Sequence, residues 1–224
     1  RNFEEEIDLT QNLEFVFDYN LAPDSVLHQW HDGTYVEFDP PVKGKFKWES
    51  PYWLVFSPAS GFEACTDYEA TLTEEIFKYA TKELSLPSEK TLKFHTPYLE
   101  LLTATTFWAK DTETGSVVMN TNLGFNYPVE PKKVAELMDI AIDGQSKDFK
   151  VVSEESTSYV SFAVYDVAVG DEHLAVEVKI ADGLGTTNSN WTSDNIFSMV
   201  TEVPSREHLL IKNVEAEHLS LIHI

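Results

Sequence analysis

The stretch Phe62-Glu63-Ala64-Cys65-Thr66-Asp67-Tyr68 is the part of the sequence that says most about the fold. An apolar residue is followed by a Thr and then a Tyr at the spacing found where a chain crosses between the sheets of a β-sandwich. At such a corner the Tyr is buried and its hydroxyl needs a partner, which we expect to be a backbone acceptor in the preceding turn. Phe62, Thr66 and Tyr68 are therefore predicted to be structural residues.

Short runs of alternating apolar and polar residues extend on both sides of this motif. The first group of predicted strands lies at 13–17, 35–38, 45–48, 53–56, 68–72 and 92–94, with turn formers such as Asp32-Gly33 and Ser57-Pro58 between them. The second group lies at 99–109, 116–127, 149–152, 159–165, 173–180 and 197–203, and residues 111–115 are expected to join its first two strands as a hairpin. Helical patterning is confined to 73–82 and 131–138. Short strands at this spacing are typical of antiparallel sandwiches.

The two groups follow one plan, which indicates a tandem repeat. Residues 12–17 match 122–127, and in each case a Pro follows, Pro23 or Pro131, and then an apolar pair. Further along, 46–48 match 149–151, 54–56 match 160–162, and 68–72 match 174–178, although the second copy lacks the Tyr of the corner. We predict an all-β chain of two tandem Ig-like or fibronectin III-like antiparallel β-sandwich domains, at 1–98 and 99–203. Residues 204–224 are expected to begin a third module or to be an artificial tail.

The charge balance excludes several classes of partner. The 224 residues include 38 acidic and 16 basic side chains, for a formal net charge of −22. Nucleic acids and anionic lipid surfaces both need clustered Lys and Arg, so neither is expected to bind. No apolar run reaches the ~18 residues that a membrane helix needs. The single cysteine, Cys65, excludes an internal disulfide.

Two sets of residues have side chains of the kinds that bind metals. His28, His31 and Asp32 have the side chains to hold zinc, but a loop that ends in Asp-Gly more often leaves such residues solvated. The acidic runs at 4–6, 74–75 and 154–155 offer oxygens for calcium, yet none has EF-hand spacing. We expect neither metal nor cofactor.

No catalytic motif is present. The sequence has no G-x-S-x-G elbow and no glycine-rich phosphate loop, and Cys65 stands between Glu63 and Asp67, which disfavour a thiolate. No pair among the acidic residues is singled out for glycoside chemistry. Exposed tryptophans remain as a platform for carbohydrate, although Trp in alternating strands is more often core; the candidates are Trp30, Trp53, Trp108 and Trp191. Asn190-Trp191-Thr192 fits a glycosylation sequon.

The residues 41–48, 54–58 and 62–68 together resemble the first macroglobulin-like domains of bacterial alpha-2-macroglobulins, and 12–17 look like the strand with which those domains begin. Residues 114–178 are similar to the sandwich that follows. The resemblance implies a non-catalytic segment of a large exported protein that traps proteases in the periplasm or cell envelope, with a lipid anchor upstream. The Cys-x-Glu-Gln thioester motif of that family is not matched here, because the single cysteine reads Cys65-Thr66-Asp67-Tyr68.

On this reading the chain is a piece of a longer protein. Its partners are the remaining domains of the same chain and, through the full-length protein, the target proteases; the piece itself is expected to be a monomer. The alternative is a surface adhesion or carbohydrate-binding protein of tandem Ig-like modules, in which exposed aromatic residues make the contacts. An enzyme is the third and most distant possibility.

Overall fold

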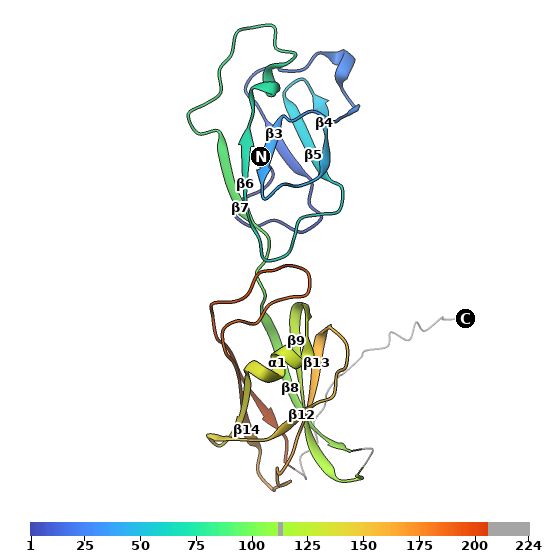
Figure 1. The fold of residues 1–224 in the computed structure, drawn as a ribbon, viewed down its shortest axis with the longest axis vertical. Coiled ribbons are helices and arrows are strands. Elements are labelled where there is room, and N and C mark those ends of the chain that lie inside the picture. Colours follow the sequence, from blue (N-terminus) through green and yellow to red (C-terminus); the bar gives the residue numbers. More distant parts are fainter. Residues whose placement is uncertain (112–113, 206–224) are drawn as a thin grey trace, which may run out of the picture. The chain divides into compact units, whose positions relative to one another are not determined.

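The structure is a computed structural model that describes residues 1–111 and 114–205. The chain divides into two compact units (Figure 1). The first unit consists of residues 1–100 together with 185–193, and the second of 101–184 together with the described residues from 194 onward.

The first unit contains two antiparallel sheets. One has the order β1-β5-β4-β2, formed by β1 (Leu13–Val16), β5 (Trp53–Pro58), β4 (Gly44–Ser50) and β2 (Trp30–His31). The other has the order β3-β6-β7, formed by β3 (Val36–Asp39), β6 (Asp67–Leu72) and β7 (Thr91–His95). Two 3-10 turns, η1 (Asp24–Val26) and η2 (Glu74–Phe77), lie between strands.

An aromatic core holds these two sheets together. Strand alternation turns Phe46 and Trp48 of β4 inward, and both are buried against residues of the opposite sheet. Tyr35 stands edge-on to both of those rings, at 5.5 and 5.9 Å between centroids. Phe38 of β3 packs at 4.5 Å on Phe56 of β5. Burial of this much aromatic surface between two sheets is what makes the unit a sandwich.

The N-terminal segment closes one side of this sandwich. Phe3 is buried and lies edge-on to Phe15 of β1 and Phe94 of β7, so it bridges the two sheets. Ile7 donates its backbone N–H to the carbonyl of His95 at the end of β7. At the outer edge of β1, the side-chain oxygen of Asn2 accepts the backbone N–H of Glu14 at 2.9 Å. The side-chain amide of Asn2 therefore occupies a position on the outer edge of β1 that a neighbouring strand would otherwise take.

The second unit also contains two antiparallel sheets. One has the order β12-β13-β9-β8, formed by β12 (Phe149–Val151), β13 (Thr157–Val164), β9 (Val117–Val129) and β8 (Leu101–Lys110). The other has the order β11-β10-β14-β15, formed by β11 (Gln145–Ser146), β10 (Met138–Ile142), β14 (Leu174–Ile180) and β15 (Phe197–Val203). The helix α1 (Pro131–Leu137) follows β9 and starts at a proline, whose fixed φ suits the first helical position.

Strand order confirms the predicted repeat. The set β1-β5-β4 of the first unit corresponds to β9-β13-β12 of the second, and β3-β6-β7 corresponds to β10-β14-β15. The helical segment after each proline recurs as η1 and α1. The chain is therefore all-β, and both units are sandwiches built on one pairing scheme.

The corresponding strands differ in register. Leu13 pairs with Phe56 in the first unit. Leu123, which matches Leu13, pairs with Val160, which matches Leu54 and not Phe56. The offset is thus two residues, and because side chains alternate with a period of two, the same face stays inside.

Three strands were not predicted: β2, β10 and β11. β10 is almost fully buried, so its sequence does not alternate between apolar and polar residues. Its first residue also belongs to the predicted helical segment 131–138. The expected boundary between residues 98 and 99 lies two residues before the observed one, and the assignment of 185–193 to the first unit was not expected. Of the segment 204–224, the residues from 206 onward lie outside the described part of the chain.

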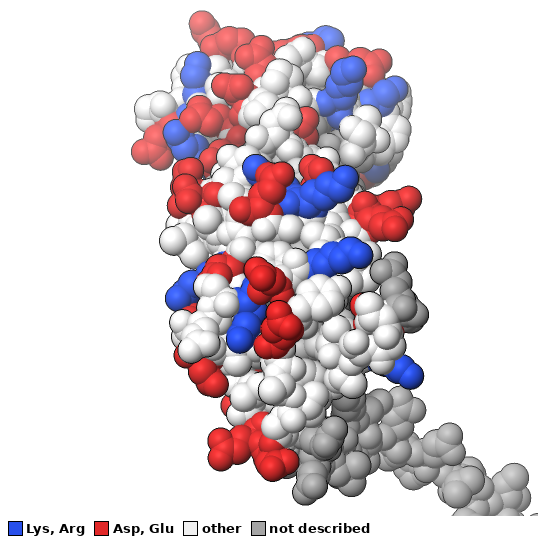
Figure 2. Space-filling model, turned by 60° about the horizontal axis from the view of Figure 1, so that its bottom comes forward, with Lys and Arg blue, Asp and Glu red and all other residues white. Residues whose placement is uncertain are grey.

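Acidic side chains spread over the face shown in Figure 2, and the Lys and Arg residues lie among them. This agrees with the net charge of −22. Among the described residues, no helix is long and apolar enough to cross a membrane.

Candidate functional site

The corner predicted from the sequence is formed by the turn before β6. The Tyr68 side chain is buried, and its phenolic oxygen accepts the backbone N–H of Glu63 at 2.9 Å. The partner is thus a backbone donor, not the acceptor that the sequence led us to expect. Phe62 packs edge-on against the Tyr68 ring at 5.2 Å, and the Phe94 ring of β7 stacks on the Tyr68 ring at 5.4 Å. Burial raises the pKa of the Tyr68 hydroxyl.

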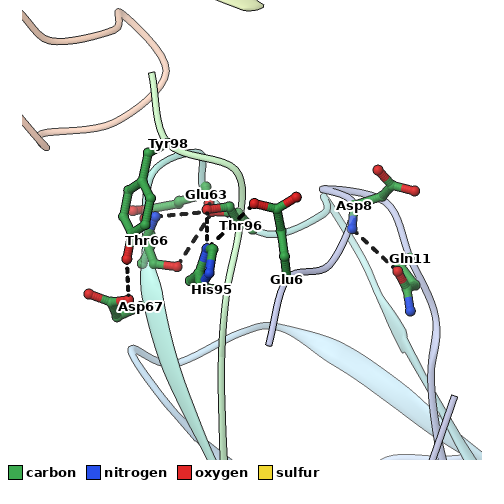
Figure 3. Close-up of polar contacts among 9 residues, drawn as sticks. All are labelled: Glu6, Asp8, Gln11, Glu63, Thr66, Asp67, His95, Thr96 and Tyr98. Carbon is green, nitrogen blue, oxygen red and sulfur yellow. Dashed lines mark hydrogen bonds and ion pairs between the residues drawn. The ribbon is translucent and has the colours of Figure 1, made fainter. Parts of the chain in front are cut away.

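Thr66 and Thr96 link the turn to the end of β7 (Figure 3). Thr66 donates its hydroxyl to the carbonyl of Ala64 at 2.9 Å, as in a local side-chain turn. The hydroxyl of Thr96 accepts the N–H of Thr66 at 3.0 Å and donates to the carbonyl of Glu63 at 2.7 Å. Thr96 is fully buried, so these bonds satisfy groups that water cannot reach.

The outer rim of the corner carries the ionisable side chains. Tyr98 donates its hydroxyl to a carboxylate oxygen of Asp67 at 2.6 Å. This hydrogen bond, with a smaller contribution from burial, raises the pKa of Tyr98 to about 12. The His95 ring stacks on the Tyr98 ring at 4.8 Å, and its Nδ1 lies 3.0 Å from the carbonyl of Thr96 and 3.9 Å from a carboxylate oxygen of Glu6 (Figure 3).

Cys65 sits inside this turn with a positive φ of 52°, a conformation that costs a non-glycine residue about 1–2 kcal/mol. Its side chain is buried, and burial raises the pKa of the thiol. A protonated, inaccessible thiol is a poor nucleophile. The hydrogen bonds and ion pair of the corner connect the turn at 62–68, the end of β7 and the N-terminal segment at Glu6. This is a structural role.

The structure separates the three residues considered for zinc. His28 Nδ1 lies 3.1 Å from a carboxylate oxygen of Glu49, and His31 Nε2 lies 3.0 Å from the carbonyl of Val26. Asp32 pairs with Lys45 at 3.5 Å. Each side chain is occupied by a different partner, and no group of three potential metal ligands occurs within residues 1–111 and 114–205.

Glu75 and Glu6, which belong to two of the acidic runs, make local contacts. One carboxylate oxygen of Glu75 accepts the N–H of Thr34 at 2.8 Å, and the other pairs with Lys78 at 3.7 Å. Glu6 faces His95 as described above. These contacts tie loops to the surface of the first unit.

The four tryptophans considered as a carbohydrate platform do not share one surface role. Trp30 is 50% exposed and stands with the Lys47 ammonium 4.9 Å from its ring centroid. The Trp108 indole N–H donates to the carbonyl of Pro204 at 2.8 Å in the second unit. The ring of Trp191 packs at 5.5 Å on that of Tyr98 in the first unit. The indole nitrogen of Trp53 is buried. Asn190 of the sequon is exposed.

The sequence did not reveal Thr96 as a member of the corner. Thr96 lies 30 residues beyond Thr66 and carries no motif. Only the antiparallel pairing of β6 with β7, in which Asp67 faces His95, brings the two threonines together.

Comparison with known proteins gives one informative match. The chain is 22% identical over 153 residues to the alpha-2-macroglobulin of Rickettsia conorii (strain ATCC VR-613 / Malish 7), which covers 67% of this chain and 8% of that protein. The resemblance inferred from the sequence is thus confirmed as a similarity to a bacterial alpha-2-macroglobulin. No protein-family model matches the chain.

Among solved structures, the chain is similar to an L,D-transpeptidase from Mycobacterium tuberculosis H37Rv. The TM-score is 0.28 at 13% sequence identity, over 74% of this chain and 72% of that one. Similarity at this level decides nothing about activity.

Proposed function

We propose that the chain is a non-catalytic structural segment of an alpha-2-macroglobulin-like protein that traps proteases at the cell envelope of a bacterium. The observation that carries this proposal is the match to the Rickettsia conorii protein over 67% of the chain. Two sandwiches with the same strand order are the kind of repeated scaffold module that such a large protein would need.

The architecture of the first unit suits a protein that meets proteases. A protease must open the backbone locally before it can cleave, and segments with few buried contacts open most easily. In the first unit the corner is held by hydrogen bonds of Glu63, Thr66 and Thr96, and the N-terminal segment is anchored by the buried Phe3. Scaffold modules of this kind resist the proteases that the rest of the molecule captures.

The proposal is tested by inhibition assays with the longer protein that contains this segment. A trap shields large substrates from the captured protease but leaves its active site intact. We expect the longer protein to block trypsin cleavage of casein while cleavage of a small chromogenic peptide continues, and a version that lacks residues 1–205 to lose this effect. The 224-residue chain alone should inhibit neither reaction. Inhibition by the chain alone, or full trapping without it, would show that the division of roles is wrong.

One observation favours carbohydrate binding as a second candidate function. The half-exposed Trp30 borders a shallow hollow of about 230 Å³ that is also lined by Gly44, Lys45, Ser57 and Pro58. An exposed indole beside charged and hydroxyl groups is able to stack on a sugar ring and hydrogen-bond to its hydroxyls. On this reading the chain is a surface adhesion module.

This second candidate is tested by tryptophan fluorescence during titration with soluble polysaccharides. Saturable quenching that disappears in Trp30→Ala but persists in Trp108→Phe would support it. No response across a panel of bacterial and host polysaccharides would exclude it.

A further inference from the structure

An apolar cavity of about 290 Å³ opens on the surface of the first unit where β1 ends. Its lining includes Val16, Phe17 and Asp18 at the end of β1, Ile76 of η2, and Leu84 and Leu86 from the connection between η2 and β7. Val16 and Tyr19, which both line the cavity, are 56% and 57% exposed, so apolar surface is open to solvent here.

The backbone beside this cavity is an open strand edge. In β1, Glu14 directs its N–H away from β5, because that group donates to the Asn2 side chain. Phe17, in contrast, donates to Tyr52 on the β5 side. Backbone groups alternate along a strand, so Val16 directs its N–H and carbonyl to the same outer side as Glu14. Asn2 fills the edge at Glu14 and leaves it open at Val16.

The connection between η2 and β7, which also lines the cavity, has unpaired main-chain groups as well. In the described structure no residue from Lys82 to Glu89 makes a hydrogen bond. A strand that entered the cavity would thus find unused backbone groups on β1 and in this connection.

The charge at the cavity indicates what would enter. Asp18 is the one charged side chain among the residues that line it, it is exposed, and it forms no ion pair within the described part of the chain. A basic side chain beside Asp18 would be attracted by it, and by a chain of net charge −22. The same net charge disfavours a second copy of this chain as the occupant.

We propose that the outer edge of β1 at Val16 binds an extended peptide as an additional strand. The peptide places an apolar side chain in the cavity between Phe17 and Leu86 and a Lys or Arg beside Asp18. Main-chain hydrogen bonds supply the affinity, and the cavity with Asp18 supplies the selectivity for alternating apolar and basic residues. This surface is separate from the Tyr68 corner, and its function does not depend on protease trapping.

The test uses the full chain and the synthetic peptide acetyl-Lys-Val-Lys-Val-Lys-amide. We expect saturable binding by calorimetry, with the largest changes in amide NMR signals at Val16, Asp18 and Leu86. A peptide of the same sequence with N-methyl groups on both valines cannot complete the ladder, so it should bind about tenfold more weakly. Added salt should weaken binding because Asp18 is exposed.

Two variants connect the binding to the named groups. Val16→Pro removes a backbone N–H that makes no bond within the sheet, a change that outer strands tolerate, and should weaken binding about tenfold. Asp18→Asn should weaken binding of the lysine peptide several-fold, whereas the matched Asp8→Asn, which removes a charge elsewhere on the same unit, should not. Circular dichroism shows whether each variant is folded.

Equal binding of the N-methylated and unmodified peptides would overturn strand addition. So would NMR changes that map to another strand edge, or the absence of binding at millimolar peptide. Because the peptide comparison needs no protein variant, the test holds even if Val16→Pro does not fold.

Discussion

The phenolic oxygen of Tyr68 receives the backbone N–H of Glu63 at 2.9 Å, five residues earlier in the chain. Replacement by Phe keeps the ring contacts with Phe62 and Phe94 but leaves that N–H without its partner. We expect Tyr68→Phe to lower the free energy of unfolding of the first unit by about 1–2 kcal/mol. Urea unfolding, followed through NMR signals of that unit, measures the change. The exposed Tyr52 provides the control: Tyr52→Phe should leave stability nearly unchanged, and an equal loss in both variants would contradict the role of the hydrogen bond.

Thr96 and Thr121 are both fully buried, but only Thr96 has hydrogen-bond partners for its hydroxyl. Thr96→Val leaves the N–H of Thr66 and the carbonyl of Glu63 short of a partner, and should cost about 2 kcal/mol in the first unit. Thr121 faces Thr106 across β8 and β9, and neither hydroxyl oxygen has a partner within the described part of the chain.

Thr121→Val therefore removes an unsatisfied polar group, and we expect the stability of the second unit to stay within about 1 kcal/mol or to rise. Thermal unfolding of both variants is the measurement. A large loss in Thr121→Val would mean that this hydroxyl has a partner, such as a buried water.

The raised pKa of Tyr98 predicts how its protonation and the stability of the first unit depend on pH. Tyr98 should lose its proton near pH 12, above the ordinary value of 10.0, because the neutral hydroxyl donates to Asp67. Since the folded-state pKa exceeds the unfolded one, the contribution of this bond to stability is complete below pH 10 and is lost as the pH rises towards 12.

Carbon-13 NMR of labelled tyrosine rings follows this titration. Asp67→Ala should bring the pKa of Tyr98 back towards its ordinary value, and Asp67→Asn, which retains an acceptor without the charge, should lie between. Titration of Tyr98 that is unchanged in Asp67→Ala would show that the carboxylate is not the cause.

Gly124 in β9 is needed because two side chains lie over it. A Cβ at this position would collide with Oγ1 of Thr103 on β8 and approach the Tyr159 ring of β13 to 3.2 Å. We expect Gly124→Ala to destabilise the second unit by about 1–3 kcal/mol through overpacking. The double variant Thr103→Ala with Gly124→Ala removes the closest atom and should recover much of the loss. Thermal unfolding is the measurement, and a lack of recovery would contradict the steric explanation.

The sequence was sufficient to predict most of the fold. The strands that alternate visibly, such as β4 and β5, were found, and so was the correspondence between the two units, because both depend on local pattern and order. β10 was missed because a strand buried on both faces has no alternation. The pair Asp143-Gly144, with positive φ at both residues, marks the β10–β11 hairpin and is a signal that could have revealed it.

The polar part of the corner was less predictable than its motif. Phe62, Thr66 and Tyr68 lie within seven consecutive residues and so form a local motif. Their partner Thr96 is brought to them by the pairing of β6 with β7, which no local sequence pattern indicates. The same holds for the cavity beside Val16, whose walls are distant in the chain and meet only in the folded unit.

The two-residue offset between matching strands bears on how neighbouring modules avoid domain swapping. Repeated units with one strand order are prone to exchange equivalent strands while they fold. In the first unit Leu13 pairs with Phe56, whereas in the second unit the matching Leu123 pairs with Val160. A strand exchanged between the units would bury the correct face, but its backbone pairing would be shifted by two residues from the native register. We therefore expect each sandwich to pair with its own strands more readily than with those of its neighbour.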